Sequence, residues 1–173
     1  MFTITIRAAF FSLKIAFGVV LFSVLLGVPI GMFAGLSGKK TEEIIMRITD
    51  GFLAFPPLIL PLVITTILGP SLNNVILGIS ASWFPWYVRI ARSQSLVISS
   101  LDYVSISKSM GAGKLHIIKK HILPNSINPI LTQASIDAGY AILTSAGLSF
   151  IGLGAQHPDA VSYTHLRAHE TCL

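Results

Sequence analysis

Residues 13–36 read LKIAFGVVLFSVLLGVPIGMFAGL, and Lys14 is the only charged residue among them. A helix needs about 20 apolar residues to cross the roughly 30 Å hydrocarbon core of a bilayer. This run is longer than the roughly 7–15-residue apolar region of a cleaved signal peptide, and Gly38-Lys39-Lys40 follow it as a stop-transfer flank. We therefore predict that residues 13–36 form a membrane span.

Three further apolar runs follow, at about Gly51–Leu68, Asn74–Val97 and Ser126–Ile151. Of the 173 residues, 53% are hydrophobic and only 11% are charged, and the mean hydropathy is +0.76. This composition is too apolar for a soluble domain of this size. The sequence predicts an all-α, polytopic membrane helical bundle with four spans in residues 1–160.

Basic residues are unevenly distributed between the apolar runs. Lys39, Lys40 and Arg47 lie in the 37–50 connector, and the 102–125 segment holds four lysines, whereas residues 69–74 hold no Lys or Arg. The positive-inside rule places both basic connectors in the cytoplasm and the 69–74 turn outside. The chain then begins outside, so we expect an earlier span to be missing; Arg7 and Lys14 are mild exceptions to the rule.

Helix breakers lie in every span. Pro29, Pro56, Pro57, Pro61, Pro85 and Pro129 are predicted to interrupt the helices where neighbours or a cavity satisfy the freed backbone groups. Gly31 and Gly35 form a G-x-x-x-G step, which lets a second helix approach closely. Generic packing is the alternative explanation for these two glycines.

Residues 102–125, DYVSISKSMGAGKLHIIKKHILPN, form a basic, helix-patterned segment between apolar stretches. A simple connector needs only a few polar residues, so this segment, hereafter the loop, is predicted to bind another protein. An amphipathic helix lying on anionic lipid is the alternative. That alternative would explain the lysines, but not Gly111 or the terminal Leu-Pro-Asn.

Few residues have a pattern typical of catalysis or metal binding. Residues 108–115 fail the phosphate-loop pattern because Lys108 stands at the first glycine and Leu115 replaces Ser or Thr. His116 and His121, five apart, are not expected to share a helix face as metal ligands. Cys172 is the only cysteine, so we predict no metal or redox site.

Asp137 is the acid that lies deepest in a predicted span, where a charge costs about 2.5–3.5 kcal/mol. It should face protein or water, as a path-lining residue or as a hydrogen-bonded structural acid. Trp83 and Trp86 are further path-lining candidates, with packing or interfacial anchoring as the alternative.

The loop resembles the EAA loop of ABC importer permeases: Asp102-Tyr103-Val104, then Gly111, then Leu123-Pro124 at the family's spacing. Residues 50–57, 68–75 and 146–154 are similar to the second permease subunit of the dipeptide, oligopeptide and nickel branch. The resemblance covers nearly all of residues 13–158. One departure is that Ser105-Ile106-Ser107 replace the usual Glu-Ala-Ala.

The resemblance implies a multi-pass permease subunit of a bacterial or archaeal cytoplasmic membrane, importing di- or oligopeptides or nickel. Implied partners are a second permease, two ATPase subunits that bind ATP and Mg, an extracytoplasmic substrate-binding protein and membrane lipid; no cofactor in this chain and no nucleic acid are expected. A short helix at about Ser107–Leu115 would dock on the ATPase, with Gly111 allowing a turn or a close approach. The implied coupling residues, within about residues 99–124, are Asp102, Tyr103, Ser107, Met110, Gly111, Ala112, Lys114, Leu115, Leu123 and Pro124.

An intramembrane enzyme acting on a lipid-linked substrate is the second hypothesis. Asp50, Arg89, Arg92 and the histidines could form a polar site near the inner face of the membrane. The sequence lacks a paired acid, a nucleophile with a base, or a cluster of metal ligands. ATPase binding by the purified chain would separate the two hypotheses.

Residues 161–171, VSYTHLRAHET, match the translation of a transposon-end adapter used in sequencing libraries. We therefore expect residues 161–173 to be non-native and exclude His165 and His169 from any site. The family ordinarily continues beyond the Gly-Leu-Gly stretch into a further span, so we expect both ends of the natural protein to be missing.

Overall fold

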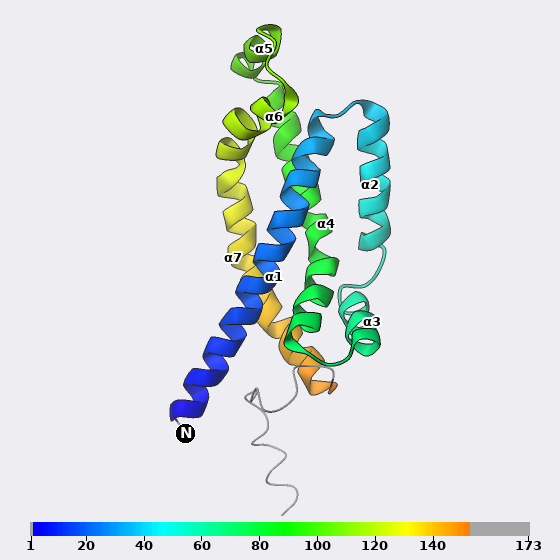
Figure 1. Ribbon diagram of the computed structural model, residues 1–173, viewed down its shortest axis with the longest axis vertical. Coiled ribbons are helices and arrows are strands. Elements are labelled where there is room, and N and C mark those ends of the chain that lie inside the picture. Colours follow the sequence, from blue (N-terminus) through cyan, green and yellow to red (C-terminus); the bar gives the residue numbers. More distant parts are fainter. Residues whose placement is uncertain (1, 153–173) are drawn as a thin grey trace, which may run out of the picture.

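The computed structural model describes residues 2–152, and every regular element in that range is a helix (Figure 1). The elements are α1 (Phe2–Leu36), α2 (Lys39–Leu53), α3 (Ile59–Leu68), α4 (Leu72–Ser99), α5 (Asp102–Ser109), α6 (Lys114–Ile117), the π-helix η1 (Ile118–Ile122) and α7 (Leu123–Phe150). The all-α helical bundle is confirmed. The adapter-like segment 161–173 lies outside the described residues.

Three long helices form the body of the bundle. α1 and α4 run side by side in the same direction, α7 runs in the opposite direction, and α2 followed by α3 descends along α4 (Figure 1). The turn after α1 and the loop therefore lie at one end of the bundle, and the turn between α3 and α4 lies at the other. Lys39 and Lys40, at the start of α2, are thus at the same end as the loop, as the charge pattern predicts.

The helices differ in how apolar they are. Among the described residues, only Ala9–Leu36 is both long enough and apolar enough to be recognised as a membrane span. α4 and α7 have 28 residues each, which is roughly 42 Å at 1.5 Å per residue. They bury serines and one carboxylate against their neighbours, which lowers their average hydropathy.

A row of three glycines brings α1 against α4. A Cβ atom at Gly27 would lie 2.6 Å from the Phe84 carbonyl oxygen, and one at Gly35 would lie 2.6 Å from the Ser95 Cβ. At Gly31 it would overlap the Val88 carbonyl oxygen. The G-x-x-x-G prediction is confirmed, and Gly27 extends the row by one further step.

The apolar run at Gly51–Leu68 is divided between two helices, as its prolines predict, but the first of them begins earlier than the run. α2 already begins at Lys39 and ends at Leu53, and α3 begins only at Ile59. Pro56 and Pro57 lie in the break; a proline has no N–H to donate and disfavours a helical conformation in the residue before it. The 37–50 segment is accordingly not an open connector, because most of it forms α2.

Three other prolines do not break their helices. Pro29, Pro85 and Pro129 lie inside α1, α4 and α7, which continue through them. Pro85 is fully buried, so the surrounding helices hold this part of α4 in place. The predicted interruptions are therefore confined to the α2–α3 junction.

Two apolar clusters stabilise the bundle. One holds Ile15, Val19, Val75, Ile79 and Leu148 from α1, α4 and α7. The other lies nearer the loop and joins residues of α1, α4 and α7 to residues of the loop itself. The loop is therefore part of the packed structure.

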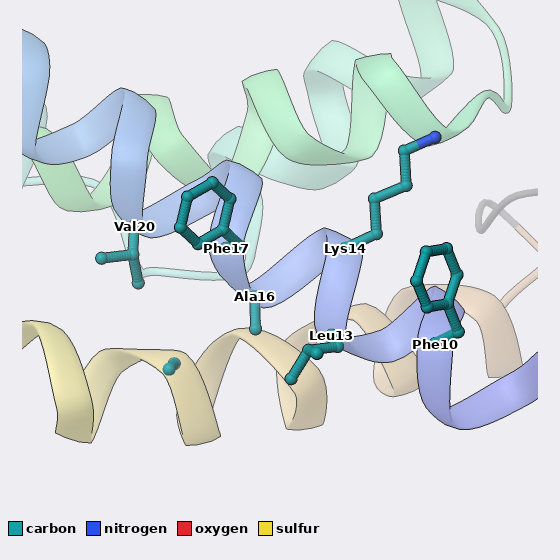
Figure 2. Close-up of a pocket in the computed structure, with 7 residues that line it drawn as sticks. Phe10, Leu13, Lys14, Ala16, Phe17 and Val20 are labelled. Carbon is teal, nitrogen blue, oxygen red and sulfur yellow. The ribbon is translucent and has the colours of Figure 1, made fainter. Parts of the chain in front are cut away.

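An apolar crevice of about 440 Å³ lies between α1 and α7. Its lining residues are Phe10, Leu13, Lys14, Ala16, Phe17, Val20 and Ala138. Leu13 and Ala16 point toward α7, whereas Lys14 extends away from it (Figure 2). The crevice thus offers an almost entirely hydrocarbon surface.

Candidate functional site

The loop reverses direction at Gly111. α5 ends at Ser109; the Gly111 amide then donates to the Lys108 carbonyl oxygen at 3.0 Å, and the Ala112 amide donates to the Ser107 carbonyl oxygen at 3.1 Å. These two bonds, together with φ = +87° at Gly111, form a Schellman motif. The helix predicted at Ser107–Leu115 is therefore wrong, because this motif terminates α5 in the middle of that range.

Gly111 is needed for its backbone angle and not for close packing. No heavy atom lies within 4 Å of a Cβ built at this position. A left-handed backbone disfavours any residue with a Cβ. Of the two predicted roles, the turn is confirmed and the close approach is not.

Three buried apolar residues hold the loop on the bundle. Val104 is fully buried, and Ile117 and Ile122 are 2% and 0% exposed. They belong to the same cluster as Met32 of α1 and Ile98 of α4. The loop is thus packed against the ends of α1 and α4 through these buried side chains.

Two lysines of the loop also contact the bundle. The Lys108 ammonium donates to the Ser99 carbonyl oxygen at 3.2 Å, and the Lys114 Nζ lies 6.0 Å from the centre of the Phe33 ring. Lys114 is thereby drawn toward α1. These contacts direct two of the four lysines back toward the bundle.

The two loop histidines lie close together, contrary to expectation. Their ring centres are 6.3 Å apart, and the His121 ring lies 5.6 Å from that of Tyr103. The reason is the π-helix at Ile118–Ile122, in which hydrogen bonds run from i to i+5. His116 lies just before this π-helix and His121 within it, and the wide turn between them brings the two rings closer to the same side than a continuous α-helix would.

A cleft of about 570 Å³ opens between α5 and the α6–η1 segment. Its lining residues are Tyr103, Ile106, Ser107, Met110, Gly111, Ala112, Gly113, His116, Lys120 and His121. The structure therefore brings together five of the predicted coupling residues: Tyr103, Ser107, Met110, Gly111 and Ala112.

The other predicted coupling residues lie around this cleft. Asp102 is the exposed first residue of α5, and Lys114 and Leu115 begin α6. Leu123 and Pro124 occupy the first turn of α7 and are exposed.

Sequence reasoning missed the cleft itself. Ile106, His116, Lys120 and His121 line it but were not among the predicted coupling residues. Ile106 could have been identified as a candidate binding residue, because it is an apolar residue in an exposed helix. Nothing in residues 118–122 distinguishes a π-helix from an α-helix.

The intramembrane candidates have separate surroundings. Asp137 is 9% exposed and accepts a hydrogen bond from the Gln133 Nε2 at 2.8 Å, with the buried Tyr87 nearby. Trp83 is half-buried against the apolar cluster that contains Ile15 and Ile79, and Trp86 is 51% exposed. Asp137 is thus a hydrogen-bonded acid within the bundle.

The charged residues required by the enzyme hypothesis form ion pairs between α2 and α4. The Arg89 guanidinium donates to the Asp50 Oδ1 at 2.6 Å, and the Arg92 Nε donates to the Glu42 Oε1 at 2.7 Å. The histidines lie in the loop, on other elements. The geometry therefore favours a structural role for these charges.

A family model matches residues 27–168 of the chain; its description is "Binding-protein-dependent transport system inner membrane component". The chain is 46% identical over 136 residues to the probable D,D-dipeptide transport system permease protein DdpC of Escherichia coli strain K12, a match covering 79% of the chain and 46% of that protein. It is 39% identical over 157 residues to the dipeptide transport system permease protein DppC of Alkalihalophilus pseudofirmus, covering 91% and 52% respectively. The chain thus spans about half the length of these relatives.

A solved structure shares the fold. It is titled as an inward-facing conformation of the MetNI methionine ABC transporter, and it aligns with a TM-score of 0.76 at 21% identity. The alignment covers 90% of this chain and 77% of that one. At this identity, the likeness supports the fold alone.

Proposed function

Because the chain belongs to the family of binding-protein-dependent transport system inner membrane components, we propose that it is the membrane-spanning permease subunit of an ATP-driven importer. In this proposal α1, the α2–α3 pair, α4 and α7 make four crossings of a cytoplasmic membrane. A second permease completes the translocation path, and two ATPase subunits, which bind ATP and Mg, dock on the loop. An extracytoplasmic binding protein delivers the substrate.

One observation supports the docking role more than any other: the loop is firmly seated yet exposes large apolar side chains. Met110 is 83% exposed, Leu115 64% and Ile106 60%, while Val104 and Ile117 on the same loop are buried. Met110 and Ile106 line the same cleft, and exposed apolar side chains that lie together are typical of sites that another protein covers. A platform of this kind can transmit the movement of a bound ATPase to α1 and α4.

Small peptides are the proposed substrates. The two relatives described above carry names that refer to dipeptides, and the family resemblance leaves nickel as the alternative. Path-lining roles for Asp137, Trp83 and Trp86 remain part of the proposal. Asp137 has the least solvent access of the three, so its role there would require the helices to separate.

The decisive experiment replaces Gly111 with Val in the importer assembled with its partner subunits in lipid vesicles. A β-branched residue at φ = +87° costs about 1–2 kcal/mol or more, so the turn should distort while insertion is unaffected. We expect substrate uptake to fall at least tenfold relative to ATP hydrolysis. Gly111→Asn, which tolerates this angle better, should have a milder effect.

Gly51→Val is the matched control, because Gly51 lies within α2 and a Cβ there meets nothing within 4 Å. This variant should transport normally. Normal coupled uptake in Gly111→Val would overturn the proposed coupling role of the loop.

A further inference from the structure

We propose that the cleft between α5 and η1 receives an acidic side chain of the ATPase subunit. This inference rests on the proposed function and deepens it. The docking contact would then run in two directions: apolar residues of the loop enter the ATPase surface, and a carboxylate of the ATPase enters the loop.

The shape of the cleft depends on the π-helix. Tyr103 and Ser107 come from α5, His116 from α6, and Lys120 and His121 from η1. The wide turn brings His116 and His121 to the same wall, and His121 also faces the Tyr103 ring. Three ring side chains and one ammonium group therefore surround a single hollow.

The chemistry of this hollow is that of a hydrogen-bond donor site. The lining residues include no Asp or Glu. The Tyr103 hydroxyl accepts from the Asn125 Nδ2 at 3.4 Å, so its own proton is available to a second partner. Each imidazole carries an N–H, and Lys120 has three donors. A carboxylate, which only accepts, is the complementary group.

Lys120 is the cation of the loop that is available for this contact. Lys108 is bound to the Ser99 carbonyl oxygen and Lys114 lies beside Phe33. Lys119 and Lys120 are exposed and have no protein partner among residues 2–152, but only Lys120 of these two lines the cleft. The two adjacent lysines therefore differ in position while sharing charge and exposure.

The rim of the cleft favours a protein partner over a lipid headgroup. Met110 and Ile106, 83% and 60% exposed, line the same hollow as the donors. Protein interfaces combine apolar side chains, buried on binding, with direct hydrogen bonds, and this hollow offers both. A flat anionic membrane surface would instead engage exposed lysines without regard to the cleft.

The test compares Lys120→Glu with Lys119→Glu in the importer assembled with its partner permease. The measurement is the dissociation constant of the purified ATPase subunit, taken at several salt concentrations, followed by coupled uptake in vesicles. We expect Lys120→Glu to weaken binding at least tenfold, because a carboxylate would then face a carboxylate. Lys119→Glu should change it less than twofold, and Tyr103→Phe should weaken it to an intermediate degree.

Three outcomes would overturn this inference. Equal losses in both lysine variants, relieved in neutral-lipid vesicles, would assign the lysines to a lipid surface. If neither lysine variant weakens ATPase binding while Gly111→Val still uncouples uptake from ATP hydrolysis, the cleft does not bind a carboxylate, and the proposed function stands without it. A Lys120→Glu loss that does not change with salt concentration would show that it does not come from a charge contact.

Discussion

Gly31 and Gly111 both need a hydrogen in place of a side chain, but for different physical reasons. At Gly31 the backbone angle is ordinary and the space is filled by α4. At Gly111 the space is open and the angle is left-handed. The same substitution should therefore damage the bundle at one site and only the loop at the other.

At Gly31, we expect Gly31→Ala to destabilise the bundle by about 1–3 kcal/mol, the usual cost of overpacking. The added methyl would meet the Val88 carbonyl oxygen and lie 2.8 Å from the Ala91 Cβ, forcing α1 away from α4. Reversible unfolding in detergent micelles measures the effect.

Gly139→Ala is the control, since Gly139 lies inside α7 with nothing within 4 Å of a Cβ. It should be neutral or stabilising by up to about 1 kcal/mol through helix propensity. Equal destabilisation of the two variants would contradict the close contact between α1 and α4.

Single residues were predicted well where local chemistry decides their conformation. The roles of Gly31 and Gly35, which are four residues apart, and of Gly111, which lies in a Lys-rich segment, could be predicted from neighbouring residues alone. The sequence left two roles open for Asp137, path-lining or hydrogen-bonded structural acid; the structure shows the hydrogen bond from Gln133, one turn away, and the path-lining role stays a prediction. The Arg92–Glu42 ion pair could not be predicted from the sequence, because its partners are 50 positions apart.

At the scale of elements, two ion pairs attach α2 to α4, and they differ in exposure. The Arg92 and Glu42 side chains are 33% and 20% exposed, whereas those of Arg89 and Asp50 are 45% and 51% exposed. Solvent screens the more exposed pair. The inner pair should therefore contribute more to the attachment of α2.

A double-mutant cycle tests this difference. We expect a coupling energy of about 1 kcal/mol or more for Arg92→Gln with Glu42→Gln, and only a few tenths for Arg89→Gln with Asp50→Asn. Thermal unfolding in detergent at low and high salt supplies the energies. The expectation fails if the outer pair proves as strongly coupled as the inner one, or if neither responds to salt.

Helix boundaries were predicted best where apolar runs are long and uninterrupted. The expected spans at 74–97 and 126–151 correspond closely to α4 and α7. The α2–α3 break was predicted from Pro56 and Pro57, but the start of α2 at Lys39 was missed because the polar residues 37–50 were interpreted as a connector. The π-helix was missed because its residues are ordinary helix formers, and tertiary packing of Ile117 and Ile122 accompanies the wide turn.

At the scale of the whole molecule, a wide apolar surface is exposed along α1. Phe10, Leu13 and Phe17 are 72%, 66% and 68% exposed, and they border the crevice beside α7. Contiguous exposed apolar side chains of this kind mark sites of membrane or protein contact. It fits contact with lipid or with a partner helix.

We therefore expect the chain to remain in the membrane pellet when expressing cells are lysed and washed with alkaline carbonate. Detergent, but not high salt, should release it, because apolar burial and not charge holds it there. A soluble peripheral protein expressed in parallel serves as the control. Recovery of the chain in the carbonate supernatant would contradict the membrane assignment.

The way the loop is attached has a mechanical consequence. Backbone-to-backbone contact along the glycine row makes α1 and α4 a stiff pair, and Val104, Ile117 and Ile122 fasten the loop to its end. A displacement of the loop should therefore move α1 and α4 together as one rigid unit. α2 is attached differently: residues 54–58 between it and α3 are not helical, and two ion pairs join it to α4.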